Sequence, residues 1–239
     1  MISDIIILAG GFGRRLQSIS QEAPKPLMPV GSRVFLDFVL DWISKYNIRK
    51  VILSLHCKPD FFQAYLDRRS FPFEIVTIVE PVPMGTGGAI KFALDNVDVS
   101  DAFCVVNGDT FLDFNLNVMF ESFISLQCSA MIGLSYVKNA ERYGIVTYNK
   151  NMALSFSEKI FNKAGWINNG CYLLRKQIFG SYQGVFSMEK GMFPDLVKQN
   201  QLYIFQTAGN FYDIGVPEDY YMFTRNFSEP NTEGVINGI

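Results

Sequence analysis

The residues with the clearest chemistry are glycines and cations that follow the first apolar stretch of the chain: Gly10, Gly11, Gly13, Arg14, Arg15 and Lys25. Glycine has no Cβ, so backbone N–H groups in such a loop can approach an anion that a larger side chain would block. Arginine presents a planar fork that matches phosphate oxygens, and lysine presents a point charge. Pro24 and Pro26 restrict the backbone on both sides of Lys25, which lowers the entropy lost when its ammonium is held toward a ligand. The segment predicts a phosphate-binding loop.

This loop differs from the two best-known phosphate-binding motifs. A Walker loop carries Gly-Lys-Ser/Thr at the start of its helix, but here arginines follow Gly13. A dinucleotide-binding loop has a small residue three positions after its second glycine, and that place holds Leu16. The stretch that ends at Leu55 is followed by His56 rather than by the acidic residue that would hold a ribose. The sequence therefore disfavours a P-loop NTPase and weakens an NAD-binding oxidoreductase, while an ordinary tight turn stays an alternative for the glycines alone.

A second glycine-rich turn, Gly85-Thr86-Gly87-Gly88, opens a predicted helix shortly after Glu80. If it lies near the first loop, its backbone amides can bind a nucleobase or a sugar; the alternative is a plain helix start that Thr86 caps. The Glu80 carboxylate can accept hydrogen bonds from the adjacent N–H groups of guanine, whereas thymine and uracil present oxygens on both sides of one N–H. Glu80 therefore favours GTP.

Asp109 and Asp213 are candidate ligands of a magnesium ion. Asp109 follows an apolar stretch and Asn107-Gly108, and Asp213 has a similar setting much later in the chain. Magnesium at phosphate groups typically takes one or two carboxylates and completes its coordination with phosphate oxygens and water. The alternatives are structural: Asp109 belongs to an Asn-Gly-Asp turn, and Asp213 caps the helix after Pro217.

Glu158, Lys159 and Asn168 suit a ligand that carries both hydroxyl groups and a phosphate. A carboxylate and an amide can orient hydroxyls, and an ammonium can pair with a phosphate. For Glu158 and Lys159 the alternative is a solvated ion pair on the surface.

These candidate sites lie between segments whose patterns alternate between strand and helix. The patterns predict strands at 5–8, 50–55, 74–79 and 102–106, and helices at 35–43, 60–66 and 88–94. Such alternation predicts an α/β fold with a doubly wound, mostly parallel sheet, helices on both faces and ligands at the carboxyl ends of the strands. The loops that start near residues 10, 80 and 107 all follow strands, so we expect them to meet at that edge.

The second half of the chain has shorter periodic segments. Strands are expected at 130–137, 144–148, 153–156, 170–174 and 203–206, and helices near 192–199 and 218–225. No linker rich in proline, glycine or serine separates the halves, so we expect one domain over residues 1–227. Residues 228–239 are expected to form a disordered tail because they are rich in Gly, Asn and Glu.

Composition limits the class of protein. With 239 residues, 49% of them hydrophobic, the chain can bury a large core, and its net charge of −2 offers no general basic surface to nucleic acid or anionic lipid. Its four cysteines stand singly and it has one histidine, which disfavours a zinc site or a disulfide scaffold. Neither a membrane span nor a signal peptide is visible. We expect a cytoplasmic protein without nucleic-acid or membrane partners, and the sequence leaves open whether it forms a homo-oligomer.

Seven segments together resemble the sugar-1-phosphate nucleotidyltransferase family. They are Leu8-Ala9-Gly10-Gly11-Phe12-Gly13-Arg14-Arg15-Leu16, Pro24-Lys25-Pro26-Leu27, Gly85-Thr86-Gly87-Gly88-Ala89, Asn107-Gly108-Asp109, Glu158-Lys159, Asn168-Asn169-Gly170 and Asp213-Ile214-Gly215-Val216-Pro217-Glu218-Asp219-Tyr220. The resemblance runs from residue 2 to about 225 in the family's order. Within the family the chain is most similar to short bacterial enzymes related to mannose-1-phosphate guanylyltransferase, particularly the D-glycero-α-D-manno-heptose 1-phosphate guanylyltransferases.

The resemblance implies a Rossmann-like three-layer α/β/α fold with a mostly parallel mixed sheet, as in GT-A-like enzymes. It implies a reaction in which a nucleoside triphosphate and a sugar 1-phosphate give pyrophosphate and a nucleotide sugar for surface polysaccharide synthesis. Residues 1–128 would then bind the nucleotide and residues 129–227 the sugar phosphate.

Site residues carry over by position. Arg15, Lys25 and Asp109 would be catalytic, and Asp109 and Asp213 would hold Mg²⁺. The nucleotide would contact Leu8, Ala9, Gly10, Gly11, Gly13, Arg15, Lys25, Glu80, Gly85, Thr86, Gly88, Asn107 and Gly108. The sugar phosphate would contact Gly144, Glu158, Lys159 and Asn168.

The chain departs from the family pattern at three places. Arg14 stands where threonine is usual, Asn169 where a small apolar residue is commoner, and Val216 where threonine is frequent. Arg14 leaves open which arginine contacts the phosphates, although the alignment of Leu16 favours Arg15. A guanylyltransferase is the leading hypothesis. The alternatives are the same reaction with UTP, dTTP or CTP, and a non-catalytic sensor of nucleotide or sugar phosphate, which the retained charged residues disfavour.

Overall fold

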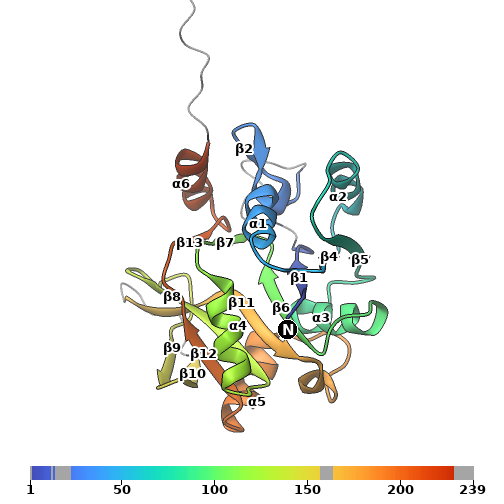
Figure 1. Ribbon diagram of the computed structural model, residues 1–239. Coiled ribbons are helices and arrows are strands. Elements are labelled where there is room, and N and C mark those ends of the chain that lie inside the picture. The colour runs from blue at the N-terminus through green and yellow to red at the C-terminus, as the bar shows by residue number, and fades with distance from the viewer. Residues whose placement is uncertain (1, 12, 14–22, 157–163, 229–239) are drawn as a thin grey trace, which may run out of the picture.

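A nine-stranded sheet forms the centre of the molecule, and helices cover both of its faces (Figure 1). The computed structural model describes residues 2–11, 13, 23–156 and 164–228. The sheet runs in the order β5-β4-β1-β6-β11-β8-β12-β10-β9. Strands β5, β4, β1 and β6 are parallel to one another. From the β6–β11 pair onward the pairs are antiparallel, except that between β8 and β12. The predicted three-layer α/β/α fold with a mostly parallel mixed sheet is confirmed.

The strands and helices have the following bounds. The sheet contains β1 (Asp4–Leu8), β4 (Lys50–Leu55), β5 (Glu74–Val79), β6 (Ala102–Asn107), β8 (Ala130–Val137), β9 (Val146–Asn149), β10 (Met152–Phe156), β11 (Gly165–Arg175) and β12 (Leu202–Gln206). Two small pairs lie outside it: β2 (Pro29–Val30) with β3 (Arg33–Val34), and β7 (Thr110–Leu112) with β13 (Phe211–Asp213). The helices are α1 (Phe35–Ser44), α2 (Pro59–Leu66), α3 (Gly85–Asn96), α4 (Leu116–Ser125), α5 (Phe193–Lys198) and α6 (Pro217–Phe227).

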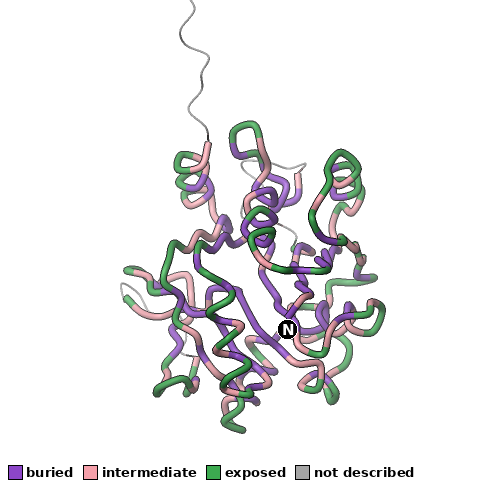
Figure 2. The backbone as a smooth tube through the Cα atoms, in the orientation of Figure 1, coloured by how far each residue is buried: buried purple, intermediate pink, exposed green. Residues whose placement is uncertain are grey.

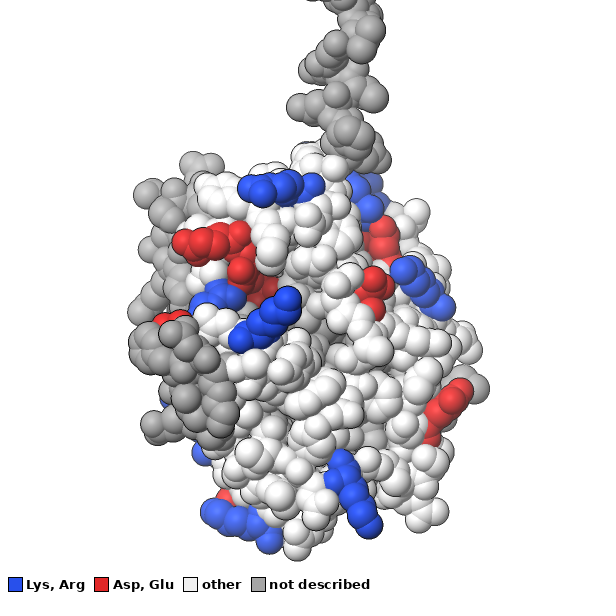
Figure 3. All heavy atoms as spheres, turned by 90° about the vertical axis from the view of Figure 1, so that its left-hand side faces the viewer, with Lys and Arg blue, Asp and Glu red and all other residues white. Residues whose placement is uncertain are grey.

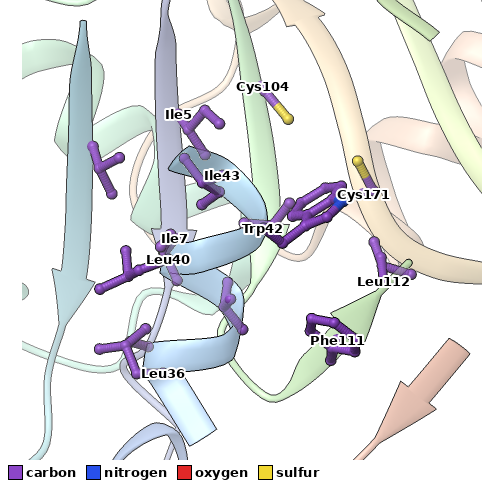
Figure 4. Close-up of a cluster of buried hydrophobic side chains, with 14 of the residues drawn as sticks. Ile5, Ile7, Leu36, Leu40, Trp42, Ile43, Cys104, Phe111, Leu112 and Cys171 are labelled. Carbon is purple, nitrogen blue, oxygen red and sulfur yellow. The ribbon is translucent and has the colours of Figure 1, made fainter. Parts of the chain in front are cut away.

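Alternation along the central strands assigns each helix to one face of the sheet. Ile5 and Ile7 of β1 belong to the core shared with α1, α2, α4 and α6, whereas Ile6 belongs to the core shared with α3 and α5. Both faces of β1 are therefore buried, which explains its unbroken apolar run. Figure 4 shows Leu40 and Ile43 of α1 beside Ile5 and Ile7, and Figure 2 shows the buried strands inside an outer layer with many exposed residues.

The sequence patterns located most elements but missed the shortest ones and α4. In α4, Leu116, Met119 and Phe123 stand at helical spacing and are fully buried, so a helical signal was present there. Strands β7 and β13 have three residues each and pair with one another, and so short a run carries no local pattern. Strand β11 begins at Gly165 rather than at 170. The helix expected near 192–199 is α5, and a π-helical turn, Met188–Met192, precedes it.

Four expectations concern the surface charge, membrane spans, disulfides and the C-terminal tail. On the face shown in Figure 3, charged side chains of both signs lie close together, and much of that face is uncharged. Within the described ranges, no helix is both long and apolar enough to cross a bilayer. The four cysteines form no disulfide, and three of them are buried. Apart from Ser228, the expected disordered tail lies outside the described residues.

A buried carboxylate at the start of β1 joins three segments. Asp4 is fully buried; it accepts hydrogen bonds from the Arg49 guanidinium and from the N–H and hydroxyl of Ser100. Burial by itself raises the pKa of Asp4, but these donors outweigh it, and the pKa lies below the ordinary value of 3.8. The folded state therefore binds this proton less tightly than the unfolded state, so the carboxylate stabilises the fold above pH 3.8, and that stability is lost as the pH falls further.

Replacing Asp4 with asparagine is therefore expected to lower the free energy of unfolding by about 1–3 kcal/mol at pH 7, since the Arg49 guanidinium and the Ser100 N–H and hydroxyl lose a charged, buried acceptor. Urea titrations should show the difference from the wild type shrinking below about pH 4, where the wild-type carboxyl also takes up a proton. Asp41→Asn is the control, because Asp41 forms an exposed ion pair with Arg33 and its loss should cost less than about 1 kcal/mol. Equal losses for the two variants would contradict the stabilising role of Asp4.

Candidate active site

Loops at the carboxyl ends of β1, β5 and β6 enclose a cavity of about 340 Å³ at one edge of the sheet. Its lining is Leu8, Ala9, Gly10, Gly11, Lys25, Pro26, Glu80, Pro83, Met84, Gly85, Thr86, Ala89, Asn107, Gly108 and Asp109. We call this space the first cavity. It brings together most of the residues predicted to contact the nucleotide. Gly13 and Gly88 do not line it, and Arg15 lies outside the described residues.

Glu80 lies in the wall of the first cavity and is held by the protein. The Ser54 hydroxyl donates to its Oε1 at 3.0 Å, and the Met84 N–H donates to its Oε2 at 3.1 Å. Only 6% of the residue is exposed. Each carboxylate oxygen keeps capacity for a further donor, so the contact of Glu80 with a guanine edge stays a prediction. The observed bonds also fix the turn between β5 and α3.

The start of α3 is fastened to a segment from the second half of the chain. The Phe186 carbonyl accepts hydrogen bonds from the N–H groups of Gly87 and Gly88, each at 3.1 Å. A Cβ at Gly88 would lie 2.5 Å from the carbonyl oxygen of Gly184, so glycine is what permits this close approach. The N–H groups of Gly87 and Gly88 are thus engaged within the protein, and Gly88 has a packing role.

Thr86 does not cap α3, so the alternative interpretation of this motif is wrong. The N-cap residue is Met84, and no side chain caps the helix. The Thr86 hydroxyl instead accepts a hydrogen bond from the Met188 N–H at 2.9 Å and donates to Glu189 Oε2 at 2.7 Å. Thr86 therefore connects the wall of the first cavity to the π-helical turn.

A second cavity of about 500 Å³ adjoins the first and shares Gly11, Lys25, Asn107 and Asp109 with it. Its other lining residues are Gly13, Thr110, Arg142, Tyr143, Asn168, Asn169, Gly170, Phe211, Asp213 and Gly215. The two spaces therefore meet around one group of residues.

Lys25 and Asp109 form an ion pair where the two cavities meet. Lys25 Nζ lies 3.0 Å from Asp109 Oδ2, and the two side chains are 17% and 35% exposed. Lys25 begins a short 3₁₀ turn, Lys25–Leu27, and Asp109 lies between β6 and β7. The pair places a cation and a carboxylate in the wall that both cavities share, where phosphate groups from two ligands can meet.

Asp213 comes to the same place through β7 and β13. Asp213 pairs with Thr110 in the β7–β13 ladder, and the Ile214 N–H donates to the Asp109 carbonyl at 3.0 Å. The interpretation of Asp213 as a helix cap is wrong, because the N-cap of α6 is Val216. Its carboxylate instead accepts hydrogen bonds from the Gly215 N–H at 2.7 Å and the Tyr143 hydroxyl at 3.0 Å.

The negative charge of Asp109 acts on the Asp213 carboxyl. Burial raises the pKa of Asp213 above its ordinary value, and the nearby negative charge of Asp109 raises it further. Two carboxylates that face one cavity are a donor set that a divalent cation would stabilise, with phosphate oxygens and water to complete its coordination. In the part of the chain that the structure describes, no group of three or more His, Cys, Asp or Glu residues could hold a metal ion. The two aspartates fit a metal that shares its coordination with a phosphate.

Asn168 reaches the second cavity from an irregularity in β11. The pairing of β11 with β8 shifts register between Asn168 and Tyr172, and Gly170 has a φ of +79°. A Cβ at Gly170 would lie 2.5 Å from the Asn107 side chain, so the glycine allows β11 to pack against the end of β6. Such irregularities redirect side chains, and here Asn168 and Asn169 both line the cavity.

The nucleotidyl transferase family model matches residues 4–229. The chain belongs to this family. Nucleotidyltransferases of this family generally use a divalent metal ion.

This nucleotidyltransferase is similar in sequence and structure to named proteins. A D-glycero-alpha-D-manno-heptose 1-phosphate guanylyltransferase of Campylobacter jejuni is 37% identical over 226 residues, which are 92% of this chain and 98% of that protein. An enzyme with the same name from Aneurinibacillus thermoaerophilus is 36% identical over 219 residues, 91% of this chain and 95% of the relative. The crystal structure of HddC from Yersinia pseudotuberculosis complexed with GMP-PN has a TM-score of 0.84 and 33% identity, and the match covers 95% of this chain and 100% of that chain.

Four residues of the nucleotidyltransferase were predicted to contact the sugar phosphate, and the structure describes two of them. Asn168 lines the second cavity, Gly144 does not, and Glu158 and Lys159 lie outside the described residues. Sequence reasoning missed Arg142 and Tyr143, which line this cavity directly before Gly144. Their position beside a predicted site residue was an available signal.

Arg142 and Tyr143 link the second cavity to the rest of the fold. The Arg142 guanidinium pairs with Asp219 of α6 and donates a hydrogen bond to the Tyr143 hydroxyl at 2.9 Å. Burial raises the pKa of Tyr143, as does the nearby Asp213 charge, so the phenol stays protonated and can donate to Asp213.

Replacing Gly88 of the nucleotidyltransferase with alanine is expected to displace the segment around Gly184, because the added Cβ meets backbone. We expect a loss of about 1–3 kcal/mol in the free energy of unfolding and a weaker affinity for GTP, measured by chemical denaturation and calorimetry. Gly191→Ala is the matched control, since a Cβ at Gly191 meets nothing within 4 Å. If both variants bind GTP like the wild type, the Gly88 contact does not shape the first cavity.

Proposed function

We propose that this nucleotidyltransferase transfers GMP from GTP onto a sugar 1-phosphate, D-glycero-α-D-manno-heptose 1-phosphate in preference to mannose 1-phosphate, to give a GDP-sugar and pyrophosphate. The observation that carries the proposal is the Lys25–Asp109 ion pair at the junction of two cavities. A transfer between two phosphorylated ligands needs such a junction, because the reacting phosphates must come together there. The choice of GTP and the heptose is supported by the two relatives of 36–37% identity and by the GMP-PN complex of HddC.

In the proposed reaction a phosphate oxygen of the sugar 1-phosphate attacks the α-phosphorus of GTP. A new P–O bond forms, and the bond from the α-phosphorus to the bridging oxygen breaks to release pyrophosphate. No covalent enzyme intermediate is required, so the protein acts by positioning the reactants and neutralising charge. Lys25 neutralises phosphate oxygens of both ligands. Arg15, outside the described residues, is proposed to neutralise the leaving pyrophosphate.

The remaining assignments follow from the two cavities. Mg²⁺ is the proposed metal; Asp109 and Asp213 would hold it, and when bound it neutralises charge on phosphate oxygens. The first cavity, lined entirely from residues 1–128, takes the nucleotide. The second, lined from residues 1–128 and 129–227 together, takes the sugar phosphate, within one domain over residues 1–227. GTP is made in the cytoplasm, which is therefore the proposed location.

The test is pyrophosphate release by the purified protein with Mg²⁺. GTP, UTP, dTTP, CTP and ATP are each paired with mannose 1-phosphate and with D-glycero-α-D-manno-heptose 1-phosphate. We expect release that requires GTP, with a higher kcat/KM for the heptose phosphate. Release with another nucleotide alone would refute the base assignment, and nucleotide binding without release from any pair would favour a sensor.

A further inference from the structure

A chain of hydrogen-bonded side chains connects the two cavities behind their walls. Its ends are Thr86, which lines the first cavity, and Asn168, which lines the second. Its middle is Glu189, in the π-helical turn Met188–Met192. Among the described residues that line the two cavities, neither Glu189 nor Tyr172 appears, so both act from behind the lining.

The chain has two arms, one from Glu189 to each cavity. The arm toward the first cavity begins at Glu189 Oε2. This oxygen accepts hydrogen bonds from the hydroxyls of Thr86 and Ser187, both at 2.7 Å. The Thr86 oxygen in turn accepts the Met188 N–H at 2.9 Å. The Thr86 side chain is therefore held by a donor and an acceptor, both from the turn that carries Glu189, and its rotamer is fixed.

The arm toward the second cavity runs through Tyr172. Its hydroxyl lies 3.5 Å from Glu189 Oε1 and accepts a hydrogen bond from Asn168 Nδ2 at 3.0 Å. Tyr172 is 1% exposed; burial raises its pKa, and the Glu189 charge raises it further, so the phenol keeps its proton. Because the phenol oxygen accepts from the Asn168 amide, its own proton is left to face the Glu189 carboxylate.

The direction of this chain decides how Asn168 faces the second cavity. Its Nδ2 is turned to Tyr172, and its Oδ1 accepts the Gly170 N–H at 3.0 Å. The amide therefore has one fixed orientation, with one remaining N–H and one oxygen lone pair available to a ligand. A short π-helical segment often marks a functional position. This one carries Glu189, whose two carboxylate oxygens accept hydrogen bonds from both arms of the chain.

We infer that Glu189 is a positioning residue that holds Thr86 for the nucleotide and Asn168, through Tyr172, for the sugar phosphate. The inference rests on the proposed function of the two cavities. One carboxylate thus orients a group in each binding site without contacting either ligand.

The test separates the two arms with substitutions. Glu189→Ala is expected to raise both the dissociation constant for GTP, measured by calorimetry without the sugar phosphate, and the KM for the sugar phosphate by about tenfold, as for the loss of a charge-assisted hydrogen bond. Tyr172→Phe is expected to raise only the KM for the sugar phosphate. Glu189→Gln, which keeps an acceptor oxygen, should restore part of both losses. Lys190→Ala is the matched control, since Lys190 is an exposed residue of the same turn.

A purely structural role would give a different result. It would lower kcat and the melting temperature of Glu189→Ala without changing the GTP dissociation constant or the KM of the folded protein, and that outcome would overturn the inference. So would a change in GTP affinity in Tyr172→Phe equal to that in Glu189→Ala. A wild-type protein that binds GTP but releases no pyrophosphate would contradict the proposed function alone, because GTP affinity would still decide whether Glu189 positions Thr86.

Discussion

Replacing Lys25 with methionine is expected to lower kcat by about two to three orders of magnitude, the usual cost of losing one group that stabilises developing charge. Lys25 Nζ lies 3.0 Å from Asp109 Oδ2 at the junction of the two cavities, and methionine keeps the length of the side chain without its charge. The loss should appear in kcat more than in KM, because the ammonium is proposed to act on phosphates as they react. Steady-state pyrophosphate release measures both constants.

The control for Lys25→Met is Lys198→Met. Lys198 forms an exposed ion pair with Asp195 on α5, far along the chain from the loop that carries Lys25. It should keep wild-type rates. If Lys25→Met keeps more than about a tenth of the wild-type kcat, the assignment of the catalytic centre to the Lys25–Asp109 pair is wrong.

The second large effect is expected at Asp213. Asp213→Asn should raise the Mg²⁺ concentration needed for half-maximal activity by about 100-fold or more, since one of two carboxylates is lost from the proposed site. Tyr143→Phe removes only the hydroxyl that donates to Asp213, so it should raise that concentration less, by roughly tenfold. The measurement is a titration of activity with Mg²⁺ after chelation of residual metal.

The free energy of unfolding of Asp213→Asn shows whether lost activity reflects weaker metal binding or misfolding. The pKa of Asp213 is raised by burial and by Asp109, so the folded state holds this proton more tightly than the unfolded state and the charged form costs stability near neutral pH. Asp213→Asn removes that charge and should unfold at a urea concentration no lower than the wild type. An unchanged Mg²⁺ requirement in Asp213→Asn would refute its role as a ligand, and a lower urea midpoint would show that its lost activity reflects misfolding.

The family, the fold class and the loop that carries Lys25 could be predicted from the sequence. These features depend on local signals: the apolar run of β1 and the glycines after it are each contained in a few consecutive residues, and the strand–helix alternation is a series of such short segments. The resemblance adds the order of seven such segments. Local patterns suffice here because the carboxyl ends of parallel strands must share one edge of the sheet, which brings the loops together.

The residues that act together across long sequence separations became evident only in the folded chain. Asp109 and Asp213 meet because β7 pairs with β13, and these three-residue strands have no pattern apart from their pairing. Likewise, Gly88 allows the backbone at Gly184 to pack closely against the start of α3. Glu189 connects residues that line the two cavities through hydrogen bonds to Thr86 and Tyr172. Contacts between residues far apart in sequence depend on the packing of the whole chain, and no local pattern contains them.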